Sequence, residues 1–215
     1  GRRGGHATRE KPSLRQKPFR QPRLHYGPVD VISADELDAI HDASFDVLQE
    51  IGVEVIHEQA KRLYAAAGAD VEPGGNRVRF PKGLIEQLIT TCPSSVTLHA
   101  RNPAHNIHVG GNHLFFSQVA SAPNCTDLDR GRRPGNLEDY RDLVKLGQSF
   151  NIIHVNGGYP VEPVDIHASI RHLICLSDCV KLTDKAFHMY SLGKERNRDG
   201  LEIVRIARGL THEQL

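Results

Sequence analysis

Apolar positions recur at two different spacings along this chain, and the change comes near residue 113. Before it, apolar residues return every three or four positions, which is typical of amphipathic helices. The predicted helices span 33–52, 58–67 and 81–91. Ser33 and Glu36 form a capping box at the start of the first helix, and Gly52 ends it. Short strand-like runs lie between and after these helices, at 69–72, 77–80, 95–100 and 106–109.

After residue 113, short apolar runs alternate with helical patterns. The predicted strands are 113–117, 152–155 and 186–191, about 35 residues apart, and helices begin near residues 136, 165 and 195. Repeated strand–helix units predict parallel strands with right-handed crossovers, as in a doubly wound sheet or a (β/α)8 barrel. The helix at 165–180 is expected to bury Ile166, Ile170, Leu173 and Ile174.

Three such units cannot close a barrel, since eight need roughly 200 to 400 residues. The sequence therefore predicts the N-terminal portion of a longer α/β protein. We divide it into an extended basic arm (1–30), a helical and β extension (31–112) and the first part of a (β/α) barrel (113–215). No apolar run approaches the ~18 residues that span a bilayer, and no membrane partner is expected.

The loops that follow the predicted strands are where we expect chemistry, because parallel α/β folds place their sites at the carboxyl ends of strands. The second loop, after the strand at 152–155, contains paired glycines that allow positive φ and close approach of a ligand. The candidate binding residues are Gln118, Ser121, Asn124, Gly157, Gly158, Tyr159, His188, Tyr190 and Ser191.

Charge is distributed unevenly. The net charge is +1, yet residues 1–24 hold eight Lys or Arg and one acid, so the remainder carries −6. A basic segment can bind nucleic acid non-specifically. Its lack of apolar periodicity favours an extended arm laid over its own domain or a neighbouring subunit, and no nucleic-acid partner is expected.

Cysteine and histidine positions suggest no metal centre. The four cysteines lack a CxxC spacing, which favours reduced thiols in a cytoplasmic protein, and Cys175 and Cys179 are expected to be buried thiols on one helix face. The region containing His99, His105, His108 and His113 lacks the compact ligand pattern of a zinc site. Asp127 and Asp129 suggest a calcium loop but lack its twelve-residue pattern. We instead expect Asp129 and Arg132-Arg133 to brace a loop.

Several stretches resemble the trimethylamine methyltransferase family, whose members use a corrinoid to demethylate methylated and quaternary amines. They are Arg2-Arg3-Gly4-Gly5, the first helix through Gly52-Val53, Thr97-Leu98-His99-Ala100-Arg101-Asn102-Pro103, Gly131-Arg132-Arg133-Pro134-Gly135, Gly157-Gly158-Tyr159-Pro160-Val161-Glu162-Pro163 and Tyr190-Ser191-Leu192-Gly193. The matches follow a consistent order over nearly the whole chain.

The resemblance implies a TIM barrel enzyme that transfers a methyl group from an amine of the trimethylamine or glycine betaine type to Co(I). The cobamide (corrinoid) is carried by a partner corrinoid protein and is not bound directly, and a homo-oligomer is expected. The nucleophile is then the cobalt, so the chain must hold and orient a cation. Tyr159 and Tyr190 would face the cation, while Gln118, Asn124 and His188 would orient polar groups.

Other interpretations stay open. Tyr159 can simply pack the rim, and Gly157-Gly158 can serve only to turn the chain. His154, in the middle of a strand, fits a hydrogen-bonded structural histidine better than a catalyst. The runner-up function is a non-catalytic truncated family member that acts as a binding or assembly module. A phosphate-binding barrel is weakly supported, because no GxGxxG or Walker pattern is present.

Overall fold

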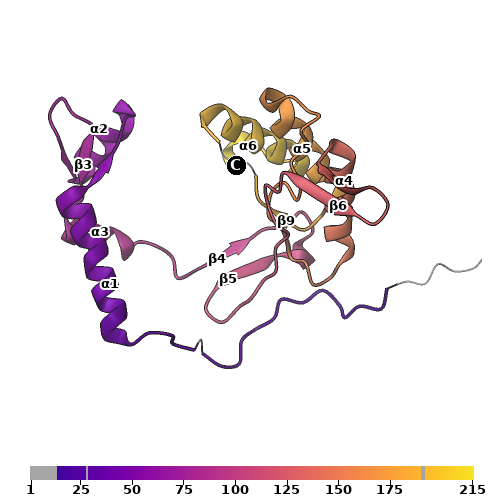
Figure 1. Cartoon of the computed structure of the whole chain (residues 1–215), viewed down its shortest axis with the longest axis horizontal. Helices are drawn as coiled ribbons and strands as arrows, with labels where there is room; N and C mark the ends of the chain where they lie inside the picture. The colour runs from indigo at the N-terminus through magenta and orange to yellow at the C-terminus, as the bar shows by residue number, and fades with distance from the viewer. Residues whose placement is uncertain (1–13, 28, 190–191) are drawn as a thin grey trace, which may run out of the picture. The chain divides into compact units, whose positions relative to one another are not determined.

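We analysed a computed structural model of the chain, which describes residues 14–27, 29–189 and 192–215 (Figure 1). The chain forms two compact units. The helical unit is Tyr26–Ser94, and the main unit combines the described residues up to His25 with Ser95–Leu215. Ser95–Asn112, which the sequence groups with the helical extension, thus belongs with the main unit. Its hairpin residues Ala100 and Ile107 pack there against Val155 and Ala186.

The helical unit follows the sequence pattern closely. Helix α1 (Ala34–Asp46) starts at the predicted Ser33–Glu36 capping box and continues as a π-helical turn, η1 (Val47–Ile51). Gly52 ends it at φ +70°, where a Cβ would lie 2.3 Å from the Val78 carbonyl oxygen. The remaining elements are β1 (Val53–Glu54), α2 (Glu58–Ala67), β2 (Asp70–Val71), β3 (Arg77–Arg79) and α3 (Lys82–Ile89). The sheet is antiparallel in the order β1-β3-β2, and the predicted β2–β3 hairpin is confirmed.

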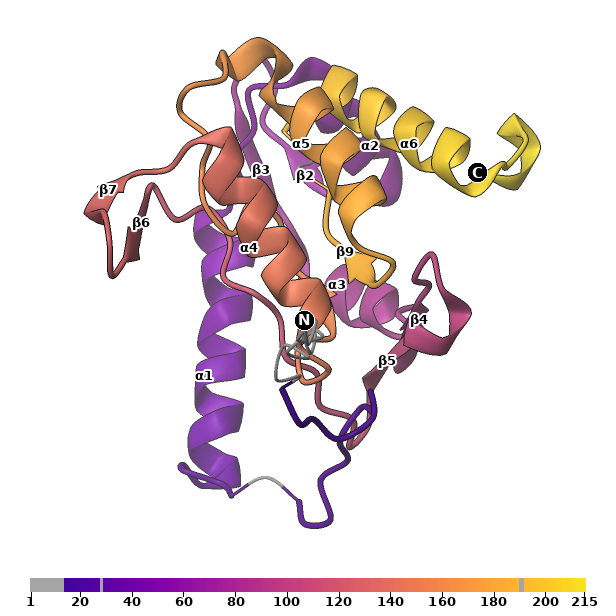
Figure 2. The same cartoon turned by 90° about the vertical axis from the view of Figure 1, so that its right-hand side faces the viewer.

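The main unit opens with an antiparallel hairpin of β4 (Ser95–Leu98) and β5 (Ile107–Gly110), joined through η2 (Pro103–His105). Three helices then alternate with short strands, and they lie beside one another (Figure 2). In chain order the elements are β6 (Asn124–Asp127), β7 (Gly131–Pro134), α4 (Leu137–Ser149), β8 (Val155–Asn156), α5 (Ala168–Leu182), β9 (Ala186–Phe187), α6 (Lys194–Arg208) and η3 (His212–Gln214).

The predicted strand–helix repeat is present as three parallel segments. Val155 of β8 pairs in parallel with Ala186 of β9, and Ser117 forms a parallel bridge to Val155. Helices α4, α5 and α6 follow these segments in turn. The described residues form a mixed α/β structure without a closed barrel, so the complete TIM barrel stays a prediction.

The predicted strands were too long. Within 113–117 only His113 and Ser117 pair, and His113 pairs with Arg23 of the arm. The apolar Ile152 and Ile153 do not extend β8, because Ile153 closes a turn by donating its N–H to the Phe150 carbonyl. The segment predicted to continue to residue 191 pairs only through Ala186–Phe187, and residues 190 and 191 lie outside the described part.

Two further expectations need correction. Helix α5 buries Cys175, Leu176 and Cys179, and Cys175 packs in the core that contains Tyr140 and Tyr159. Of the four residues predicted to be buried, Ile170 and Leu173 are exposed, and Ile166 and Ile174 are half-buried. The segment around Asp127 is a hairpin, β6–β7, rather than a loop. Its brace is Arg133, which pairs with Asp127 (Nη1–Oδ2 2.7 Å) and with Asp139 of α4.

The starts of the three parallel segments, which we call the amino edge, are locked by buried polar groups. His154 is fully buried: its Nδ1 accepts from the Phe116 N–H (3.1 Å), and its Nε2 lies 3.2 Å from the Arg20 carbonyl oxygen. His154 is thus buried and hydrogen-bonded, as predicted, although it lies just before β8 rather than within a strand. Asp184 accepts from Gln148 (2.8 Å) and Asn102 (3.1 Å), and its Oδ1 lies 2.8 Å from His105 Nδ1.

Lys185 completes this edge. Its side chain is buried, and Nζ donates to the carbonyl oxygens of Gly147 (2.8 Å) and Phe150 (2.7 Å) at the end of α4. Burial lowers the pKa of Lys185 to about 8. Hydrogen bonds replace the water that this ammonium loses, which is the condition for burying such a group.

The described part of the arm lies over the main unit, as predicted. The Gln16 side chain donates to the Ser149 carbonyl and accepts from the Asn151 N–H. The Gln21 side chain likewise donates to the His108 carbonyl and accepts from the His108 N–H. Leu24 donates its N–H to the Asn112 carbonyl (2.8 Å). The glutamines therefore fix an extended segment that has few apolar residues of its own.

Candidate functional site

The ends of the three parallel segments lie side by side, and we call them the carboxyl edge. Gln118 donates its N–H to the Val155 carbonyl (3.1 Å), and His188 donates its N–H to the Asn156 carbonyl (2.9 Å). Ser121 likewise donates its N–H to the Tyr159 carbonyl (2.7 Å). The backbone thus brings the first, second and third candidate loops to one edge of the main unit.

Gly157 sits where two of these chain segments touch. A Cβ at this position would lie 2.5 Å from both the Gln118 carbonyl oxygen and Ser117 Oγ. Any side chain here would push the neighbouring segment away. Gly158 adopts φ +129°, a conformation that favours glycine. Close packing thus accounts for Gly157 and backbone conformation for Gly158, which fits the interpretation that the two glycines turn the chain tightly.

The side-chain amide of Gln118 points toward helix α4. Its Nε2 donates to the Leu143 carbonyl of α4 (2.8 Å), and its side chain fills the space beside Gly147. Gln118 therefore connects the first parallel segment to α4. Asn124 opens strand β6 and pairs in register with Pro134, so it belongs to the β6–β7 hairpin.

Tyr159 lies in the core beneath the edge. It is 7% exposed, and its ring meets Tyr140 edge-on with centroids 5.7 Å apart. The neighbouring thiols of Cys175 and Cys179 are also buried, and burial raises their pKa values to about 12 and about 11. These cysteines are the buried thiols that the sequence predicts. A packing role for Tyr159 is consistent with this position.

Two predicted residues have side chains at the open side of the edge. His188 is exposed and borders a small cavity together with Tyr159. Ser121 is also exposed and holds φ +61°, a left-handed conformation that is uncommon for a residue with a Cβ. Tyr190 and Ser191 lie outside the described residues.

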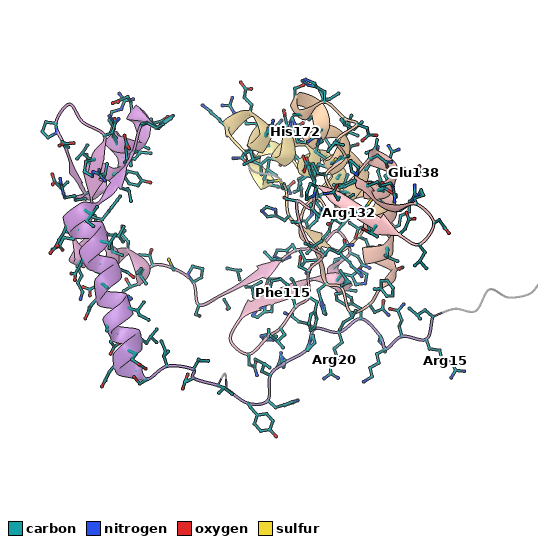
Figure 3. All side chains as sticks on the ribbon, in the orientation of Figure 1. Arg15, Arg20, Phe115, Arg132, Glu138 and His172 are labelled. Atoms are coloured by element: carbon teal, nitrogen blue, oxygen red, sulfur yellow. The ribbon has the colours of Figure 1, made fainter. Side chains whose placement is uncertain are left out.

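The cavity beside His188 includes residues that the sequence did not suggest. His172 of α5 and Arg196 of α6 both line it. His172, labelled in Figure 3, has its Nε2 2.7 Å from Asp199 Oδ2, a contact that joins the two helices. His172 Nδ1 has no hydrogen-bond partner among the described residues. No sequence motif marks the contact between His172 and Asp199, because the two residues are 27 positions apart on different helices.

A network of ion pairs lies at the β6–β7 hairpin, next to the start of α4. Arg130 and Arg133 both contact Asp127 and Asp139. The Arg130 backbone N–H, followed by the two guanidinium groups, lowers the pKa of Asp127 to about 2. Burial would raise the pKa of Asp139, but hydrogen bonds from Cys125 and Arg133 lower it. The network fixes the hairpin against α4.

Within residues 14–27, 29–189 and 192–215, no group of three or more His, Cys, Asp or Glu side chains could hold a metal ion. The rings of His108 and His113 contact each other, with centroids 5.0 Å apart, without further ligands beside them. No helix in these ranges is long and apolar enough to cross a membrane.

Comparison with known proteins gives one consistent family. A family model described as trimethylamine methyltransferase matches residues 1–214. A glycine betaine methyltransferase from Desulfitobacterium hafniense (strain Y51) is 36% identical over 179 residues, which cover 83% of this chain and 37% of the relative. A trimethylamine methyltransferase from D. hafniense (strain DSM 10664 / DCB-2) is 26% identical over 81% of this chain and 35% of its own length.

A trimethylamine methyltransferase from Methanosarcina mazei is 30% identical over 122 residues, or 55% of this chain. The chain thus spans little more than a third of the length of the first two relatives. The family model covers both units, including the arm, the β4–β5 hairpin and all three strand–helix repeats. The chain belongs to the trimethylamine methyltransferase family.

Proposed function

We propose that this chain is part of an enzyme that transfers a methyl group from a quaternary or methylated amine to a corrinoid protein. The observation that carries the proposal is the family match over residues 1–214, together with the identity to a glycine betaine methyltransferase. Identity to that relative is 36%, against 26% for the D. hafniense trimethylamine enzyme over a similar span. Glycine betaine is therefore the preferred donor in this proposal.

The methyl acceptor would be Co(I) of a cobamide held by the partner protein, and it enters as a substrate. The methyl–nitrogen bond breaks as the methyl–cobalt bond forms, and the amine leaves with the electron pair. The enzyme must orient one methyl group and exclude water. This requires no protein nucleophile, so the side chains of the carboxyl edge would bind and orient the donor rather than attack it.

We assign roles to the predicted residues from their exposure and contacts. His188 and Ser121, exposed at the carboxyl edge, would contact the donor, and a betaine carboxylate would accept hydrogen bonds from them. Asn124, Gly157 and Gly158 would shape the loops around it. Gln118 and Tyr159 would hold the edge from behind. Tyr190 and Ser191 remain candidates for the cation and the carboxylate.

Methyl transfer can be followed through the absorbance of the corrinoid. The full-length protein that contains this chain is mixed with a reduced corrinoid protein and either glycine betaine, trimethylamine or no amine. We expect loss of Co(I) and formation of methyl-Co(III), faster with glycine betaine than with trimethylamine. Persistence of Co(I) with every methylated amine, in a protein shown to be folded, would contradict the proposed function.

A further inference from the structure

The helical unit carries an apolar stripe that the described residues leave exposed. Leu37, Ile40, Val47 and Ile51 are between 50 and 59% exposed. With Ser44 they repeat at alternating spacings of three and four residues, which is the pattern of a helix seam that packs against another surface. Phe45, the buried residue of α1, points to a different face.

The same helix is strongly acidic. Residues 34–51 contain six carboxylates and no lysine or arginine: Asp35, Glu36, Asp38, Asp42, Asp46 and Glu50. Asp42 pairs with Lys82, and Glu36 is held in the capping box. Two such helices would repel each other, so pairing of α1 with its own copy is disfavoured.

The arm presents the complementary surface on the main unit. A groove along it has an apolar floor that includes Phe19, Phe150 and Ile152. Four cationic side chains and no carboxylate line this groove: Arg15, Lys17, Arg20 and Arg23. Their charges form no ion pair with any described residue, and Arg15 and Arg20 point away from the body of the unit (Figure 3).

We propose that the acidic, apolar-striped helix α1–η1 of one copy docks in the basic arm groove of a second copy, so that the chain self-associates by a reciprocal exchange. The stripe would cover the apolar floor, and the carboxylates would meet the unpaired arm cations. Apolar contact supplies the affinity, and opposite charge selects this pairing over helix-to-helix contact. The glutamines that tie down the arm give the groove a fixed shape.

Charge exchange tests this pairing. One variant carries Arg15→Glu and Arg20→Glu, and the other carries Asp46→Lys and Glu50→Lys near the helix C-terminus, where cations are favourable. In sedimentation velocity, each variant alone is expected to associate at least about tenfold more weakly than the parent chain. An equimolar mixture should recover association, because every reversed charge then faces its opposite.

The mixture separates this arrangement from the alternatives. Helix docking within one chain would break in each variant and would not recover on mixing. Association through another surface would be unaffected by either reversal. Either result, or a parent chain that stays monomeric at all concentrations, would overturn the proposal.

A second pair of variants tests the stripe without changing charge. Ile40→Ser should weaken association, whereas Leu63→Ser, an equally exposed apolar change on α2, should not. Equal effects of the two would also contradict the assignment. Far-ultraviolet circular dichroism confirms that each variant retains its helices.

Discussion

The two edges of the parallel segments are built differently. At the amino edge, His154, Asp184 and Lys185 are buried or half-buried, and each has two or more hydrogen-bond contacts to other elements. At the carboxyl edge, the side chains of His188 and Ser121 are exposed, and the segments are aligned by backbone hydrogen bonds. One edge thus holds the segments in place through buried polar contacts, while the other presents exposed side chains. Four changes test this division.

The largest effect is expected from Lys185→Ala. The change leaves the Gly147 and Phe150 carbonyls without their donor and opens a space in the core, which should lower the free energy of unfolding by about 3 kcal/mol. Urea denaturation measures this, with Lys145→Ala on the exposed face of α4 as the control. An effect no larger than that of the control would remove Lys185 from the locking edge.

Gly157→Ala should be next. Its Cβ would meet the Gln118 carbonyl oxygen and Ser117 Oγ at 2.5 Å, and such overpacking costs about 2 kcal/mol. Gly83→Ala in α3 is the matched control, because nothing lies within 4 Å of that position and alanine favours a helix. If Gly157→Ala unfolds at the parent's urea concentration, the close approach of the two segments is not a constraint.

The pH dependence of the free energy of unfolding should reveal the lowered pKa of Lys185. Its pKa is about 8 in the folded chain and 10.5 in an ordinary lysine, so the unfolded chain binds more protons between these values. The contribution of Lys185 to stability therefore rises with pH across that window, by about 1–2 kcal/mol. The buried cysteines oppose it equally in the parent and in a Lys185 variant, so they cancel when the two are compared. The parent should gain this relative to Lys185→Met between pH 8 and pH 10. Parallel curves for the two proteins would argue against a buried ammonium.

The smallest effect on stability is expected from His188→Ala. Since the side chain is exposed, the free energy of unfolding should change by less than about 0.5 kcal/mol, while affinity for the methylated amine falls. His25→Ala, also exposed and remote from the carboxyl edge, serves as the control for a binding measurement by calorimetry. Unchanged affinity in His188→Ala would take this histidine out of the proposed site.

Local signals predicted the helices well. The Ser33 and Asn136 caps are where the sequence places them, and helix α2 has the predicted bounds, Glu58–Ala67. These features depend on neighbours within four residues. The β6–β7 hairpin was missed because its stability depends on Arg133 reaching Asp139, which lies beyond the hairpin in α4.

The carboxyl edge was predicted at the level of the backbone and not of the side chains. Strand–helix alternation correctly brings Gln118, Gly157 and His188 together. It does not reveal that the Gln118 amide turns toward α4 or that Tyr159 packs against Tyr140. The orientations of both side chains depend on contacts with helix α4, which the local sequence around each residue does not indicate. Whether these residues bind a substrate stays a prediction.

The attachment of the arm has a consequence for biosynthesis. Gln16 bonds to Ser149, 133 positions away, and His154 meets the Arg20 carbonyl across 134 positions. The arm leaves the ribosome long before its docking surface exists, and contacts so distant in sequence form late. A nascent chain must therefore keep a basic, unpaired N-terminal segment in solution until helix α4 and the turn after it have been synthesised.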